Sequence, residues 1–332
     1  MKGLYDVTRG EQIRLWITYG TIFALLFVGG YLFSQGVINQ PWTARTHMGT
    51  AVIGDALYIV GGQSSVTGEL LADIWEINPY EARLRFVGRL PYACYRPELA
   101  VSHGTLYIVG GYDGDDYRSE ILKITNGRTE SIGDLPTPRG YGAGVGVGNS
   151  LFYAGGCDRD GMLDEIIQFD LDSGETSVVA HFASPRRFIA AAQQGGLIYF
   201  VGGEDAELKC LDEIVEFDPV ARQVVRVGHL PTGRYLVNLV AWEDRLLALG
   251  GKSTLSLNEV VSIAVSGPTI TSEIVDEISE LSWSLSVEST QNRLFIVGGL
   301  HPEHARAIGL IEYAPGSTER LHAIALRKNP WK

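Results

Sequence analysis

Short apolar runs recur along this chain, and each run ends in a pair of glycines. The pairs are Gly61-Gly62, Gly110-Gly111, Gly155-Gly156, Gly202-Gly203, Gly250-Gly251 and Gly298-Gly299. Their first glycines lie 45 to 49 positions apart, a period typical of radially repeated structures. Short apolar runs bounded by turn residues predict strands that are buried on both faces. Two glycines at a strand end predict positive φ angles or close backbone approach.

The remainder of each unit also repeats. About fifteen residues after each glycine pair comes a turn or a turn-like step, such as Phe217-Asp218-Pro219, and Asp and Pro favour turns. We expect strands at Ile166–Phe169, Ile214–Phe217 and Gln223–Val227 around two of these turns. Each unit therefore predicts four short antiparallel strands, and six such sheets around an axis would leave few exposed edges. No strand is evident that crosses over to seal such a ring.

These residues resemble the kelch repeat family. The resemblance rests on the glycine pairs, the hydrophobic-Asp-Pro turns and a Leu-Pro-x-x-Arg link such as Leu230-Pro231-Thr232-Gly233-Arg234. It extends from Pro41 to Lys328 and implies an all-β, six-bladed kelch-type β-propeller over residues 43–329. The fifth unit lacks the Asp-Pro turn, and the sixth has Ser282-Trp283 where arginine is expected.

The first forty residues differ from the repeats. Residues 15–33 contain no charged residue and are long enough for one transmembrane α-helix. Residues 1–14 would form a cytoplasmic tail, because Lys2, Arg9 and Arg14 precede the span, and residues 34–42 would form a linker. The propeller is then expected on the extracytoplasmic, periplasmic side. A cleaved signal peptide is the alternative, although its apolar region would be unusually long.

Net charge and cysteine content bear on nucleic-acid binding, disulfides and metal sites. The formal net charge of −12 gives little attraction for nucleic acid, so we expect no nucleic-acid partner. Three cysteines, Cys94, Cys157 and Cys210, form neither a disulfide framework nor a metal-ligand spacing, and a Cys157–Cys210 bridge stays open.

Arginines provide the sharpest candidate site. Sixteen positions before each glycine pair stand Arg45, Cys94, Arg139, Arg186, Arg234 and Ser282. Arg96, two residues after Cys94, is placed to supply the missing guanidinium. Five arginines at one tunnel mouth would suit carboxylates or phosphates. The alternative is structural: kelch units often carry this arginine and pair it with acids or carbonyls that hold the blades together.

Other catalytic patterns are weak, and we expect no cofactor and no metal. His301 and His304 lack a third ligand at the usual spacing. The acidic segments at residues 112–116 and 158–161 resemble calcium loops only faintly and are better explained as turns. No nucleophile elbow, phosphate loop or dinucleotide fingerprint occurs in the sequence.

Two functions remain. The first is a non-catalytic scaffold or accessory subunit of an integral membrane protein complex, in contact with the bilayer through residues 15–33. The second is a periplasmic sugar-binding protein or an enzyme similar to the kelch-fold sialic-acid mutarotases, for which Glu98 is the nearest candidate acid or base.

Overall fold

The computed structural model describes residues 43–81, 83–278, 285–290, 293–298, 310–313, 321–323 and 327–328. Every regular element in these ranges is a β-strand, which confirms the prediction of an all-β fold. No helix in these ranges is long and apolar enough to cross a bilayer. The predicted tail, transmembrane helix and linker at residues 1–42 lie outside the described residues, as do Ser282, His301 and His304.

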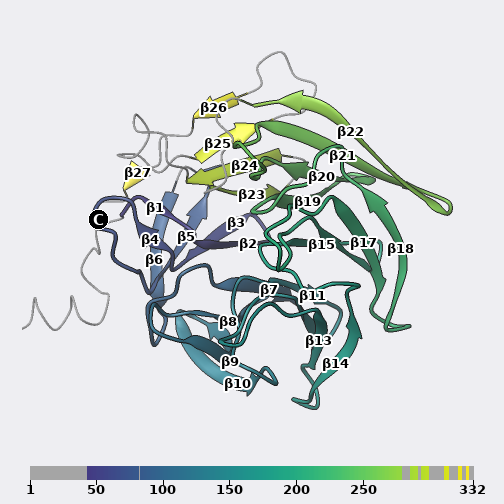
Figure 1. Ribbon diagram of the computed structural model, residues 1–332. Coiled ribbons are helices and arrows are strands. Elements are labelled where there is room, and N and C mark those ends of the chain that lie inside the picture. Colours follow the sequence, from purple (N-terminus) through teal and green to yellow (C-terminus); the bar gives the residue numbers. More distant parts are fainter. Residues whose placement is uncertain are drawn as a thin grey trace, which may run out of the picture. The chain divides into compact units, whose positions relative to one another are not determined.

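Five sheets have the predicted form of four antiparallel strands in chain order (Figure 1). The second unit contains β7 (Glu98–Ser102), β8 (Thr105–Tyr112), β9 (Tyr117–Thr125) and β10 (Arg128–Asp134). The third contains β11 (Ala143–Val147), β12 (Ser150–Ala154), β13 (Glu165–Asp170) and β14 (Thr176–His181). The fourth contains β15 (Ala190–Gln194), β16 (Leu197–Val201), β17 (Glu213–Asp218) and β18 (Gln223–His229). The fifth contains β19 (Asn238–Trp242), β20 (Arg245–Leu249), β21 (Glu259–Ser266) and β22 (Thr269–Glu277). The last contains β23 (Leu285–Thr290), β24 (Arg293–Gly298), β25 (Leu310–Tyr313) and β26 (Leu321–Ala323).

The sheet of the first unit departs from the prediction, because it has five strands. Its members are β2 (Gly49–Ile53), β3 (Ala56–Val60), β5 (Asp73–Asn78), β6 (Arg83–Arg89) and β27 (Arg327–Lys328). Strand β27, from the C-terminal end of the chain, pairs in parallel with the outer edge of β6. The prediction of a six-bladed propeller is therefore wrong: five blades have the predicted four-stranded form. The sequence left open how the ring closes, and in the structure β27 covers an edge that would otherwise expose unpaired backbone groups.

The inner strands bring the sheets together around one axis. Strand β2 contacts β7, each inner strand contacts the next through β11, β15, β19 and β23, and β23 contacts β2 again. Hydrophobic clusters lie between neighbouring sheets. One of them joins Val109 and Leu135 of the second unit to Tyr153 and Phe169 of the third. The core is thus divided among sheet-to-sheet interfaces, as expected when each repeat buries its faces against its neighbours. A short ribbon of β1 (Arg45–Thr46) and β4 (Gln63–Ser64) completes the described elements.

The glycine pairs have the backbone conformation that the sequence predicts. Both glycines of the first five pairs have positive φ, with 62° at Gly155 and 91° at Gly156. A Cβ on Gly156 would lie 2.5 Å from the carbonyl oxygen of Gly140, which belongs to the start of the same unit. Glycine is therefore required at this position both by conformation and by space.

The turns at the opposite end of the sheets also agree with the sequence. The Oδ1 atom of Asp170 accepts hydrogen bonds from the backbone N–H groups of Asp172 and Ser173. Asp218 does the same for Val220 and Ala221 in the fourth unit. These are Asx turns, which explains why Asp recurs between the third and fourth strands.

Candidate functional site: the glycine-pair end and the central channel

Four of the predicted arginines are buried within the sheets. Arg45, Arg139, Arg186 and Arg234 have side chains that are at most 1% exposed. Each forms an ion pair with an acid at the start of the third strand of its own unit. The pairs are Arg45–Asp73 at 2.7 Å, Arg139–Glu165 at 2.7 Å, Arg186–Glu213 at 2.7 Å and Arg234–Glu259 at 2.5 Å.

The same four arginines also fix the chain around them. In each, the Nε–H donates to the carbonyl oxygen two residues earlier, for example from Arg234 to Thr232 at 3.1 Å. The carbonyl oxygens of Arg139, Arg186 and Arg234 accept the N–H of the second glycine of the preceding unit, at 2.8–2.9 Å. Each of these residues therefore ties its own third strand to the neighbouring sheet. This geometry supports the structural interpretation, and a ligand-binding role for these four arginines stays a prediction.

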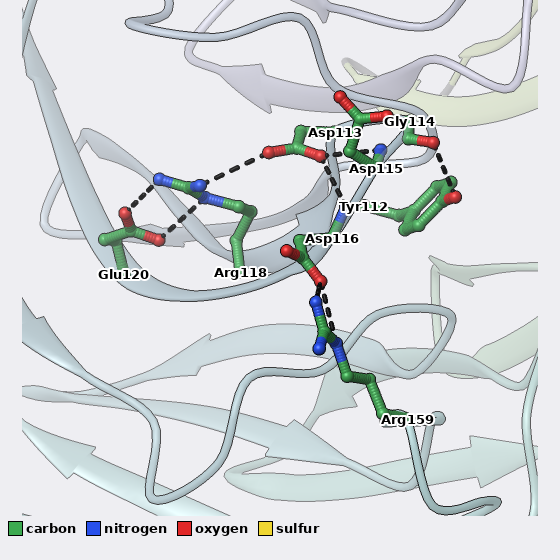
Figure 2. A network of polar contacts seen from close by, with 8 residues as sticks. All are labelled: Tyr112, Asp113, Gly114, Asp115, Asp116, Arg118, Glu120 and Arg159. Carbon is green, nitrogen blue, oxygen red and sulfur yellow. Dashed lines mark hydrogen bonds and ion pairs between the residues drawn. The ribbon is translucent and has the colours of Figure 1, made fainter.

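The second unit has no arginine at this position. Cys94 stands there instead and is fully buried. Its acid, Glu120, is paired with Arg118 through the Nε atom at 3.1 Å and through Nη2 (Figure 2). Nη1 of Arg118 also donates to Oδ2 of Asp113 at 3.2 Å, and the guanidinium lies 4.3 Å from the Tyr92 ring centroid. Arg118 thus takes over the pairing with the acid of this unit, and a binding role for Arg96 at the tunnel mouth stays a prediction.

The acidic loops form turns, as the sequence suggests. In Figure 2, Oδ1 of Asp113 accepts the N–H groups of Asp115 at 2.9 Å and Asp116 at 2.7 Å. Asp116 in turn accepts from Nε of Arg159 in the third unit, at 2.8 Å. Among the described residues no group of acids, histidines and cysteines is arranged to hold a metal ion. The described cysteines, Cys94, Cys157 and Cys210, are free thiols.

Two residues beyond each arginine position, the backbone has a positive φ although no glycine is present. The residues are His47, Arg96, Tyr141, Phe188 and Leu236, with φ between 51° and 64°. Their backbones connect neighbouring units: the N–H of Arg96 donates to His47 O, that of Phe188 to Tyr141 O and that of Leu236 to Phe188 O. Non-glycine residues rarely adopt this conformation. Because it recurs at equivalent positions, it is a regular feature of the repeat, and we call the region of these five residues the channel mouth.

Aromatic rings fill the same mouth. His47 stacks on Tyr95 with centroids 4.6 Å apart, and Tyr141 contacts Phe188 at 5.2 Å. Tyr141 also contacts Tyr112 and Tyr117, at 6.1 and 5.9 Å. The sequence analysis missed this cluster, because its members come from five different segments that only the ring of inner strands brings together.

Behind the mouth lies a cavity of about 540 Å³, lined by residues of all the inner strands. Its polar lining includes Arg96, Glu98, Asn238 and Glu288. Burial raises the pKa of Glu98 to about 7, against the opposing effect of the Arg96 charge. Burial likewise raises the pKa of Glu288 to about 7, although the Thr50 hydroxyl donates to its carboxylate at 2.6 Å. Both carboxyl groups therefore change charge near neutral pH.

Of the channel residues, the sequence identified Arg96 and Glu98 but not Asn238 or Glu288. For Asn238 a usable signal exists at one register position of the inner strands. Glu98 and Asn238 occupy the same register position, each paired with the residue before a glycine pair (Val109 and Leu249). The equivalent residues in three other units are Gly49, Ala143 and Ala190. A polar side chain at such a position is a departure from the repeat.

Apolar side chains project from loop tips at the glycine-pair end. Val66, Leu208 and Leu255 are 76%, 62% and 76% exposed. Each lies in the connection between the second and third strands of its unit, which starts at the glycine pair. The three side chains come from the first, fourth and fifth units, and a partner that covered them would remove apolar surface from water.

Comparison with known proteins agrees with the predicted resemblance. The profile of the KLHDC2/KLHL20/DRC7 Kelch-repeats domain matches residues 49–251. Alpha-scruin of Limulus polyphemus is 25% identical over 261 residues, which cover 70% of this chain and 28% of that protein. Acyl-CoA-binding domain-containing protein 4 of Arabidopsis thaliana is 25% identical over 84% of this chain and 47% of its own length.

A kelch domain-containing protein of Saccharolobus solfataricus is 33% identical over 42% of this chain. That match covers 17% of the archaeal protein. The chain thus spans less than half the length of these curated relatives.

Proposed function

This chain belongs to the kelch-repeat family, and on that premise we propose that it is a non-catalytic scaffold that binds a partner protein through its glycine-pair end. Kelch relatives are typically protein-interaction scaffolds, which supports the proposal. The observation that carries it is the set of exposed side chains Val66, Leu208 and Leu255 in the loops that start at the glycine pairs. Interface anchors are commonly apolar or aromatic groups that become buried at the centre of a contact.

We further propose that the scaffold is held at a membrane as an accessory or assembly subunit of an integral membrane complex. The uncharged segment 15–33 is the basis for the anchor, and the basic residues before it are the basis for the orientation. The five four-stranded blades, with the five-stranded sheet closing the ring, would then be displayed on the extracytoplasmic side.

The partner is tested by purification from native membranes in mild detergent, followed by mass spectrometry. The wild-type chain should co-purify with a membrane partner in a fixed ratio, and Leu208→Asp combined with Leu255→Asp should reduce that ratio at least about tenfold. Val220→Asp is the matched control. Val220 is 91% exposed but lies in a turn between third and fourth strands, at the opposite end of the sheet.

A wild-type chain that purifies without a partner after crosslinking in native membranes would contradict the scaffold proposal. Equal loss of the partner in the Val220→Asp control would contradict the choice of face. The anchor has a separate test: the full chain should resist extraction by alkaline carbonate, whereas a chain that begins at residue 34 should be released.

The sugar-binding or mutarotase-like alternative required several arginines to be available at the tunnel mouth. Four of the five have carboxylate partners inside the sheets. We therefore favour the scaffold over that alternative.

A further inference from the structure

Arg96 differs from the other buried or half-buried arginines near the channel. Its side chain has no hydrogen-bond or ion-pair partner among the described residues, and its Nε atom is buried and unsatisfied. Its guanidinium lies 5.5 Å from the centroid of the Phe188 ring, across the mouth from its own strand. A buried guanidinium N–H without an acceptor is costly, so an acceptor must come from water or from a ligand in the cavity.

A second unsatisfied donor lines the same cavity. The Nδ2 atom of Asn238 is buried without a partner in the described part of the chain, while its Oδ1 accepts the N–H of Val287 at 3.2 Å. That bond fixes the orientation of the amide and leaves only N–H donors for a ligand. The cavity of about 540 Å³ that holds both groups is within the range of small-molecule sites.

We propose that the central cavity binds a small oxyanion, a carboxylate or a phosphate, through the guanidinium of Arg96 and the side-chain amide of Asn238. Both groups are donors that lack acceptors, and a guanidinium matches the paired oxygens of a carboxylate or phosphate. Small residues such as Ala143 and Ala190 line the cavity beside polar ones such as Gln193, so there is room next to the two donors for a ligand. This site does not depend on the scaffold function.

The carboxyl group of Glu98 should make the affinity for an anion depend on pH. Its carboxyl lies near the Arg96 charge, accepts the Gly144 N–H and has a pKa of about 7. An anion bound at Arg96 places a second negative charge beside Glu98 and favours the protonated carboxyl. Binding therefore takes up a proton, and the affinity falls as the pH rises through 7.

The other titratable groups around Glu98 keep one charge state in this range. Burial raises the pKa of Cys94 to about 12 and raises the pKa of Tyr153 well above its usual value, so both stay neutral. Burial and Arg96 lower the pKa of His47 to about 4, so it is also neutral. Glu288 is the other cavity group whose pKa lies near 7, and the variant Glu288→Gln separates its contribution.

The test is isothermal titration calorimetry on the full-length protein in detergent near pH 6.5, with inorganic phosphate and citrate titrated separately. We expect saturable binding of at least one of them, and the anion that binds tells phosphate from carboxylate. Arg96→Gln should weaken that binding at least about tenfold, and Asn238→Leu several-fold. Arg159→Gln, which changes an exposed arginine outside the cavity, should leave it unchanged.

Absence of saturable binding of both anions to the wild-type chain would overturn the proposal, as would equal affinity in Arg96→Gln. If Arg96→Gln does not fold, Arg96→Lys keeps the charge but removes the Nε–H, and unchanged affinity in that variant would equally contradict the site. Between about pH 6.5 and pH 8 the wild-type affinity should fall several-fold, and that of Glu98→Gln should fall less. An affinity independent of pH in the wild type would exclude the role of Glu98.

Discussion

Arg139 and Arg96 show how differently one residue type is used in two regions of this molecule. Arg139 stands at the repeated position, is fully buried and pairs with Glu165 at 2.7 Å. Arg96 stands two residues past that position in its own unit, has positive φ and lies at the channel mouth without an ion-pair partner among the described residues. Register within the repeat, rather than residue type, therefore separates the arginines that are paired inside the sheets from Arg96 at the channel mouth.

The largest effect is expected from breaking a repeated pair. Arg139→Met should lower the free energy of unfolding by about 3–5 kcal/mol, because it leaves Glu165 without its charge partner. Urea unfolding followed by tryptophan fluorescence measures this change. The double variant Arg139→Met with Glu165→Met should recover part of the loss; a double variant as unstable as the sum of the two singles would show that the two side chains do not act as a pair.

An intermediate effect is expected in the second unit, where Arg118 is about one-third exposed. Arg118→Ala should cost about 1–2 kcal/mol, since it removes the bonds to Glu120 and Asp113 and the contact with the Tyr92 ring. The same urea titration measures it, with Arg159→Ala as an exposed control that should change stability by less than about 0.5 kcal/mol. A cost equal to that at Arg139 would remove the distinction between the buried and the substitute pair.

The smallest of these effects concerns the channel carboxyl groups and depends on pH. An unfolded glutamate titrates near 4.5, whereas the folded-state pKa values of Glu98 and Glu288 are about 7. The folded state holds protons that the unfolded state has lost, so stability should fall as the pH rises from about 4.5 to 7 and then stay level. Glu98→Gln with Glu288→Gln should be more stable than the wild type at pH 8, with little difference at pH 4.5. Thermal melting of both proteins between pH 4.5 and pH 8 measures the difference in stability. A larger gain of the double variant at low pH than at pH 8 would contradict the prediction.

Much of the fold could be predicted from the sequence, because the glycine pairs and the turn residues determine the backbone conformation locally. The glycine pairs require positive φ, and Asp170 and Asp218 form the Asx turns that their positions predict. The crossing strand β27 could not be foreseen, because the pairing of Arg327 with Arg83 joins segments from opposite ends of the chain and has no local signal.

The site was predicted less completely, for a related reason. Spacing placed the arginines at equivalent positions but could not show whether their side chains turn into the sheets or into the channel. That choice depends on acids such as Glu165 and Glu213, which follow about 26 residues later and approach only after the strands pair. Asn238 and Glu288 likewise join Arg96 only when the inner strands close around the axis.

The most direct test of the account is the urea midpoint of five single variants, in which Arg45, Arg96, Arg139, Arg186 and Arg234 are each changed to Gln. We expect clear losses of stability, of about 2 kcal/mol or more, for the four repeated arginines and a loss of less than about 0.5 kcal/mol for Arg96→Gln. A loss at Arg96 as large as the other four, or four neutral changes at the repeated positions, would contradict the division between structural and available arginines.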